Sequence, residues 1–160
     1  AFGELYDIYL DRIFRYVFYQ VRDKMTAEDI TEEVFLKAWK AIKTCKGREN
    51  SFSSWLYRIA HNHMINTVRR QQKFTTIEKV EIIDSRQEIA GEMENRELFK
   101  VLDNLPENQR QIIVLKFIDG LGNREISKIV GKSEGAVRVA QMRALAALRK
   151  HLARDTKGIV

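Results

Sequence analysis

Apolar residues recur every three or four positions along most of this 160-residue chain. That period is typical of amphipathic helices and not of strands. Three such segments precede a break, at roughly residues 2–20, 26–43 and 52–70. Four follow it, at roughly 93–103, 106–118, 123–130 and 134–152. The pattern therefore predicts an all-α fold.

The break is the stretch "KFTTIEKVEIIDSRQEIAGE", whose periodicity is weak. We interpret it as a mostly extended linker, and a short strand or a helical turn within it is the alternative. The predicted organisation is two small helical domains joined by a flexible linker. Their boundaries are 1–72 for the first domain, 73–92 for the linker and 93–160 for the second domain.

Residues that start and stop helices divide the second domain. Pro106 stands near a predicted helix start, where its missing N–H has no cost. Asp119-Gly120 is a helix stop, because glycine readily adopts the conformation that ends a helix. Asn123 and Ser133 are predicted N-caps.

The segment "NREISKIVGKSEGAVRVAQMRALAALRKHL" has the spacing of a helix-turn-helix, with Gly131 to Ser133 as its turn. One face of the longer helix holds small and apolar side chains: Val137, Ala140, Ala144, Ala147 and Leu148. The opposite face holds Arg138, Val139, Met142, Arg143, Arg149 and Lys150. Guanidinium groups suit phosphates and guanine edges, and apolar groups suit thymine methyls. The pattern favours duplex DNA binding over an ordinary solvated surface helix.

The helix "TAEDITEEVFLKAWKAIK" has two apolar residues on its polar side. Its core stripe contains Ile30, Val34, Phe35, Ala38, Ala41 and Ile42. Leu36 and Trp39 lie opposite, among Asp29, Glu32, Glu33 and Lys40. An exposed Leu–Trp pair among carboxylates is typical of a protein-docking surface. The alternative is that Trp39 packs under a neighbouring segment.

The helix "SFSSWLYRIAHNHMINTVRR" is apolar on two faces, so it is either sandwiched between other helices or uses one face for a ligand. A polar seam of Arg58, Asn62 and Arg69 runs between these faces, with Trp55 and Asn66 beside it. Asparagine offers both a donor and an acceptor, and arginine can hold a phosphate backbone. The seam therefore suits unpaired bases.

The two histidines of "HNH" do not favour a metal site. At 100° per residue, His61 and His63 point about 160° apart on a regular helix, so one ion cannot bind both. We expect surface or packing roles for them, and neither a metal nor a cofactor is predicted.

Charge narrows the class of partner. The net charge is +6. Residues 1–72 contain 12 Lys+Arg and 9 Asp+Glu, and residues 93–160 contain 13 Lys+Arg and 8 Asp+Glu. Such a balance makes nucleic acid the first partner to consider and an anionic membrane the second. No apolar run approaches the roughly 18 residues of a membrane span. The single cysteine, Cys45, fits a cytoplasmic protein without internal disulfides.

Three stretches in this order resemble one protein family: "AEDITEEVFLKAWKAI", "FSSWLYRIAHNHMINTVRR" and "LPENQRQIIVLKFIDGLGNREISKIVGKSEGAVRV". The chain resembles the bacterial sigma factors of the small extracytoplasmic-function (ECF, group IV) type. The resemblance implies a region 2 domain that docks on a coiled coil of the largest RNA polymerase subunit and captures the melted −10 element. It also implies a linker toward the RNA exit path and a region 4 domain that reads the −35 duplex. Further implied partners are the polymerase flap region and an anti-sigma factor.

The same resemblance assigns residues to each surface. Polymerase binding is implied for Asp29, Glu32, Glu33, Leu36 and Trp39. Contact with the −10 strand is implied for Trp55, Arg58, Asn62, Asn66, Arg69 and Arg70, and for Cys45 and Lys46 in the specificity loop. Contact with the −35 duplex is implied for Arg124, Ser133, Arg138, Val139, Met142 and Arg143. Two departures are Cys45, where relatives often have an aromatic residue, and Val139-Ala140, where they often have Ser-Arg.

The sequence therefore favours a sigma factor over two other classes. A stand-alone helix-turn-helix regulator with an N-terminal interaction domain is the alternative. It needs neither a basic aromatic helix nor an acidic docking helix. An enzyme is disfavoured, because no Ser/His/Asp grouping, glycine-rich phosphate loop, metal spacing or small-molecule substrate site is recognisable.

Overall fold

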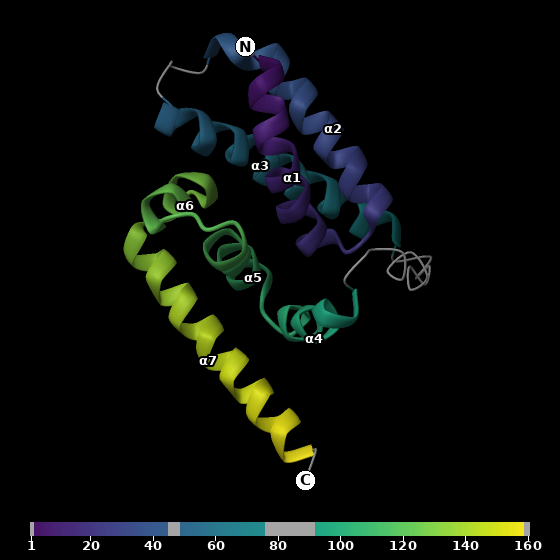
Figure 1. Ribbon diagram of the computed structural model, residues 1–160, viewed down its shortest axis with the longest axis vertical. Helices are drawn as coiled ribbons and strands as arrows, with labels where there is room; N and C mark the ends of the chain where they lie inside the picture. Colours follow the sequence, from purple (N-terminus) through teal and green to yellow (C-terminus); the bar gives the residue numbers. More distant parts are fainter. Residues whose placement is uncertain (1, 45–48, 76–91, 159–160) are drawn as a thin grey trace.

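The computed structural model describes residues 2–44, 49–75 and 92–158 (Figure 1). These residues are helical apart from short turns, and no β-strand occurs among them, as the all-α prediction requires. The predicted linker falls largely on 76–91, outside the described residues, as do Cys45 and Lys46 of the predicted specificity loop. The proposed domain boundaries stay a prediction.

The N-terminal part is a three-helix unit of α1 (Phe2–Val21), α2 (Lys24–Ala41) and α3 (Glu49–Thr75), with a 3₁₀ turn, η1 (Ile42–Thr44), after α2. The Asp23 side chain caps α2 by accepting from the Thr26 backbone N–H at 3.2 Å. All three helices contribute to the core, and its fully buried members include Ile13, Tyr16, Val17, Val34, Leu56 and Ala60. Four residues of the predicted α2 core stripe, Ile30, Val34, Phe35 and Ala38, are buried, whereas Ala41 and Ile42 at its end are only partly buried.

The C-terminal part consists of α4 (Glu92–Asp103), α5 (Glu107–Ile113), a π-helical turn η3 (Val114–Ile118), α6 (Asn123–Val130) and α7 (Glu134–Gly158). Ala140 and Ala144 are buried and let α7 lie close to its neighbours α5 and α6. Gly131 ends α6 at φ +72°, a left-handed conformation that favours glycine. The predicted helix-turn-helix is therefore present.

Of the two predicted N-caps, one is right and one is wrong. Ser133 Oγ accepts from the Ala136 backbone N–H at 3.1 Å, as a cap does. Asn123 is already the first residue of α6, and the capping position belongs to Gly122. The Asn123 side chain accepts from Gln141 Nε2 at 2.7 Å instead. This contact with α7 keeps it from capping its own helix.

The turn η3 departs from α-helical spacing just before the Asp119-Gly120 stop. The Asp119 N–H donates to the Val114 carbonyl five residues earlier, at 3.0 Å. Gly120 then adopts φ +73°, which confirms the predicted stop. The turn places Asp119 beside the N-terminal unit.

The two units pack against each other, and their buried apolar residues form one continuous cluster. In Figure 1, α6 lies between α3 and α7, in agreement with its direct contacts to both helices. The helix α7 runs along the outer side of α5 and α6 (Figure 1). The helix α3 therefore packs against α1 and α2 of its own unit and against α6 of the C-terminal unit.

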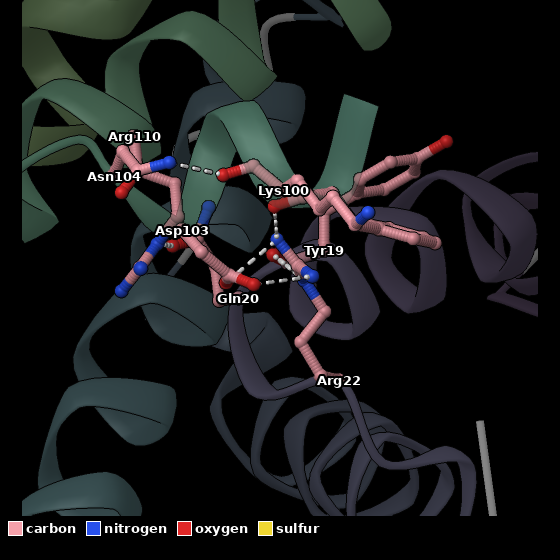
Figure 2. A network of polar contacts seen from close by, with 8 residues as sticks. Tyr19, Gln20, Arg22, Lys100, Asp103, Asn104 and Arg110 are labelled. Carbon is pink, nitrogen blue, oxygen red and sulfur yellow. Dashed lines mark hydrogen bonds and ion pairs between the residues drawn. The ribbon is translucent and has the colours of Figure 1, made fainter. Parts of the chain in front are cut away.

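One junction between the units is centred on Arg22, which follows α1 with φ 62°, an unusual value for a non-glycine residue (Figure 2). Its guanidinium donates to the Phe99 carbonyl at 2.9 Å and pairs with Asp103 at 3.0 Å. It also lies 4.2 Å from the centre of the Phe99 ring. Beside it, Arg110 Nε donates to Gln20 Oε1 at 3.1 Å.

Within the described residues, no helix combines the length and apolar character that crossing a bilayer requires.

Candidate protein and nucleic-acid interfaces

The first candidate surface is the docking patch on α2, defined as Asp29, Glu32, Glu33, Leu36 and Trp39. Leu36 and Trp39 are each 59% exposed, and the three carboxylates are exposed around them. This exposure favours the docking interpretation of Trp39 over its packing under a neighbouring segment. Two large apolar side chains in an acidic field are typical of a protein-binding site.

The docking patch contacts α3 through His63. A carboxylate oxygen of Glu33 lies 2.6 Å from His63 Nε2, and Lys37 Nζ lies 2.8 Å from His63 Nδ1. Burial and the nearby Lys37 charge lower the pKa of His63, and Glu33 opposes them. The ring is therefore neutral near pH 7 and accepts a hydrogen bond from Lys37.

The second candidate surface is the α3 seam, defined as Arg58, Asn62, Asn66 and Arg69. All four side chains are exposed. They line a hollow of about 450 Å³ whose opposite wall is Ile129, Val130 and Gly131. Trp55 lies half-buried in the first part of α3, and its ring centre is 5.7 Å from the ring centre of Phe52. Arg70 is exposed in the last part of the same helix. Guanidiniums and amides side by side can bind phosphates and base edges.

The second apolar face of α3 packs against the C-terminal unit, so α3 is sandwiched. Tyr57 is buried, and its hydroxyl donates to an Asp119 carboxylate oxygen at 2.8 Å. Arg15 Nε on α1 donates to the other Asp119 oxygen at 2.9 Å. Burial raises the pKa of Asp119, and its hydrogen bonds from Tyr57 and Arg15 oppose that shift. Burial also raises the pKa of Tyr57, and the Asp119 charge and hydrogen bond raise it further, so Tyr57 keeps its proton.

The two histidines of the sequence motif have separate partners. His61 is buried, and its Nδ1 lies 2.7 Å from the Tyr16 hydroxyl. Burial lowers the pKa of His61 to about 4, with a smaller effect from Lys132 of the C-terminal unit. A neutral ring accepts from the Tyr16 hydroxyl. His61 and His63 are thus packing residues, one of the two roles expected from the sequence.

The third candidate surface is the outer face of α7. Met142 is 70% exposed and Val139 44% exposed, and Arg138 and Arg143 are exposed beside them. Arg124 is exposed on the preceding helix, α6. Ser133 uses its hydroxyl to cap α7. On the predicted inner face, Val137, Ala140 and Ala144 are buried and Ala147 and Leu148 are partly buried, so the helix has the predicted orientation.

The structure groups the predicted residues into these three surfaces and does not bring the surfaces together. The residues missed by sequence reasoning are those that join elements: Lys37 and His63 between α2 and α3, and Arg15, Arg22 and Asp119 between the units. The contact of Tyr57 with the C-terminal unit could have been expected from the sequence, because the second apolar face of α3 needs a packing partner. The sequence pattern gives no indication of the ion pairs Arg15–Asp119 and Arg22–Asp103.

Comparison with protein families assigns the two parts of the chain. The model for Sigma-70 region 2 matches residues 5–74, and the model for Sigma-70 region 4 matches residues 95–148. The ECF RNA polymerase sigma factor SigX of Bacillus subtilis is 34% identical over 95% of this chain and 84% of its own length. The chain belongs to the ECF family of RNA polymerase sigma factors. That membership favours the sigma factor over the stand-alone regulator.

A second relative of this ECF sigma factor is BldN of Streptomyces coelicolor, 32% identical over 98% of this chain. The chain spans 62% of the length of BldN. Among solved structures, CnrH in complex with the cytosolic domain of CnrY aligns with a TM-score of 0.75 and 25% identity. It covers 97% of this chain and 89% of CnrH. The fold of the sigma factor is therefore that of its family.

Proposed function

We propose that this chain is a promoter-recognition subunit that binds core RNA polymerase and directs transcription from specific promoters. Region 2 docks on the largest polymerase subunit through the docking patch of α2. The α3 seam, with Trp55, Arg70 and the Cys45–Lys46 loop, holds the −10 element as a melted strand. The outer face of α7, with Arg124 and Ser133, reads the −35 element as a duplex.

The observation that carries this proposal is the coexistence of three different surfaces on one chain of this family. An acidic patch with exposed Leu36 and Trp39 suits a protein, and the α3 seam suits unpaired bases. A basic helix face with exposed Met142 suits a major groove. A simple DNA-binding regulator needs only the last of these.

The chemistry belongs to the polymerase in this proposal, and the chain itself acts by binding. We propose that it works in the cytoplasm, with an anti-sigma factor and the polymerase flap region as further partners. CnrH, the relative of similar fold, was solved with the cytosolic domain of CnrY. A partner of that kind is therefore a reasonable expectation for this chain.

The direct test is in vitro transcription with the purified chain, bacterial core polymerase and a library randomised at the −35 and −10 elements. We expect transcripts only when the chain is present, and selected promoters that share one −35 and one −10 sequence. The matched control omits the chain and keeps core polymerase. An absence of chain-dependent transcripts across the library would refute the proposal.

A further inference from the structure

Two adjoining hollows lie where α3 meets the C-terminal unit. The first hollow, of about 450 Å³, is the one beside the α3 seam. The second hollow, of about 260 Å³, lies between α3, α5 and the turn that follows α6. His61, Ile65, Arg69 and Val130 line both hollows. Together they have a volume within the range of pockets that bind small molecules.

The side chains that line the two hollows carry an excess of positive charge. Arg58 and Arg69 come from α3, and Lys132 comes from the turn that follows α6. Among the described lining residues the only carboxylate is Glu107, whose Oε1 accepts from Gln111 Nε2 at 3.4 Å. Three cations against one carboxylate favour an anionic ligand, and guanidinium groups bind phosphate oxygens particularly well.

Two polar side chains of these walls are buried. His61 and Gln111 are each 6% exposed, and both line the second hollow. The neutral His61 ring accepts from the Tyr16 hydroxyl at Nδ1, so it carries its proton on Nε2. Buried polar groups are normally hydrogen-bonded, and Nε2 can donate to an oxygen atom of a ligand in the hollow. The buried part of the lining therefore suits a polar ligand.

The α3 residues of the hollows follow one line of the helix. At about 100° per residue, Arg58, Asn62, Ile65 and Arg69 fall within about 60° of one another. Three helical turns separate Arg58 from Arg69, or about 16 Å at about 1.5 Å per residue. The side-chain amides of Asn62 and Asn66 lie between these two guanidinium groups along the helix. An elongated ligand with a charged end and a polar edge matches this order.

Apolar side chains line the first hollow from both sides. Ile65 is half-buried on α3, and Ile129 and Val130 end α6 on the opposite wall. A nucleobase packs its flat faces against apolar side chains while its edge forms hydrogen bonds. The amide of an asparagine offers both the donor and the acceptor that such an edge needs.

We propose that the two hollows form a binding site for a mononucleotide. The base packs against Ile65 and Val130, its edge meets the amides of the α3 seam, and its phosphate binds Arg69 and Lys132. A single nucleotide fits the volume of the hollows, whereas a continuous strand extends beyond it. The site goes beyond the proposed function, because it needs neither polymerase nor a promoter. It shares the α3 seam with the proposed −10 strand, since one nucleotide carries the chemical groups of one unit of a strand.

Isothermal titration calorimetry with the full chain tests the proposal. The probes are the four ribonucleoside 5′-monophosphates, the four nucleosides without phosphate, and inorganic phosphate. We expect one molecule of at least one monophosphate to bind per chain. Its affinity should be at least about tenfold higher than that of its nucleoside or of inorganic phosphate, because the site holds both ends of the nucleotide.

Two variants remove one phosphate contact each. Arg69→Gln and Lys132→Gln should each weaken binding of the monophosphate by at least about tenfold. Arg96→Gln and Lys100→Gln make the same changes at exposed positions of α4, outside both hollows, and should not weaken it. Circular dichroism establishes that each variant is helical. If one of the two site variants fails to fold, the other still tests the proposal.

Nuclear magnetic resonance of the nitrogen-15-labelled chain locates the bound nucleotide. The side-chain amide signals of Asn62 and Asn66 and the backbone amide signal of Gly131 should shift during the titration. The backbone amide signals of Arg138 and Arg143, on the outer face of α7, should not shift. A shift confined to α7 would place the nucleotide on an ordinary basic surface and overturn the proposal.

Three other results would also overturn it. They are the absence of binding by every probe, an affinity for inorganic phosphate equal to that for the monophosphates, and site variants with the affinity of the parent chain. A −10 oligonucleotide that shifts the Asn62 and Asn66 signals while no mononucleotide does would assign the hollows to the strand alone. Each of these results leaves chain-dependent transcription to be judged by its own assay, so the proposed function stands or fails separately.

Discussion

His63 Nε2 lies 2.6 Å from a carboxylate oxygen of Glu33, so α3 contacts the docking patch directly. The other ring nitrogen accepts from Lys37 on the same face of α2. A single buried imidazole thus connects the proposed strand-binding helix to the proposed polymerase-binding helix.

Replacing His63 tests this connection. His63→Ala should lower the free energy of unfolding by about 1 kcal/mol, through the lost contacts of a ring whose partners are largely exposed. His63→Gln keeps an acceptor for Lys37 and should lose less. Urea denaturation followed by circular dichroism measures both. Equal losses for the two variants would show that packing and not the polar contacts matters.

Trp39→Ala should weaken binding to core polymerase by about 2 kcal/mol or more, roughly thirtyfold, as expected for a large aromatic at a protein interface. Affinity for −35 duplex should not change. A competition assay with labelled chain and core polymerase measures the first, and anisotropy the second. Ile8→Ala is the control, because Ile8 is similarly exposed on α1, outside the docking patch. Comparable losses in both assays would contradict the docking role.

Arg143→Ala should reduce discrimination at one −35 position by about 1–3 kcal/mol if the guanidinium contacts a base edge. Repeating the promoter selection with the variant identifies the position that loses its preference. Arg149→Ala removes an exposed arginine further along α7 and should weaken binding without changing the preferred sequence. An unchanged preference in the Arg143 variant would remove this residue from the −35 readers.

Stability should fall in mild acid because of His61. Its folded pKa is about 4, below the ordinary value of 6.5, so the unfolded chain binds a proton first as the pH falls. Neutral His61 contributes about 3 kcal/mol at most to the free energy of unfolding. This contribution is complete above pH 6.5 and is lost as the pH falls toward 4.

Urea denaturation of the parent chain and of His61→Gln between pH 7 and pH 4 checks this expectation. Glutamine also accepts from Tyr16, and it does not titrate. The stability difference between the two chains should therefore shrink as the pH falls. Comparing them at each pH cancels the opposite effect of Asp119, whose raised pKa favours the folded state in acid. A constant difference would mean that His61 does not cause the acid sensitivity.

Local pattern was enough to predict the helices and their orientation. The faces of α2 and α7 follow from a period of 3.6 residues, and exposed Leu36, Trp39 and Met142 agree with that period. The end of α6 at Gly131 and the Ser133 cap follow from local turn chemistry. The helix predicted at 52–70 was too short, because α3 extends from Glu49 to Thr75. The residues that the prediction missed at the two ends of α3 are mostly polar, so they do not extend the apolar period from which the helix was predicted.

The contacts between the units could not be read from local pattern. Asp119 was predicted to stop a helix, and it does, but its partner Arg15 is 104 residues away. Asn123 was predicted as a cap from its type alone, and a residue on α7 binds its side chain instead. The local sequence around Asp119 and Asn123 allows several roles for each residue. In both cases a side chain that is distant in the sequence determines which role is adopted.

The π-helical turn before Asp119 holds one residue more than an α-helical turn would. An α-helix turns by about 100° and rises by about 1.5 Å for each residue. Each residue of a π turn rotates the chain by less than in an α-helix, so the five residues from Val114 to Ile118 cover about the same turn as four α-helical residues, and Asp119 still reaches Tyr57 and Arg15. The additional residue is therefore absorbed within one turn, and the Asp119 side chain keeps its direction toward the N-terminal unit.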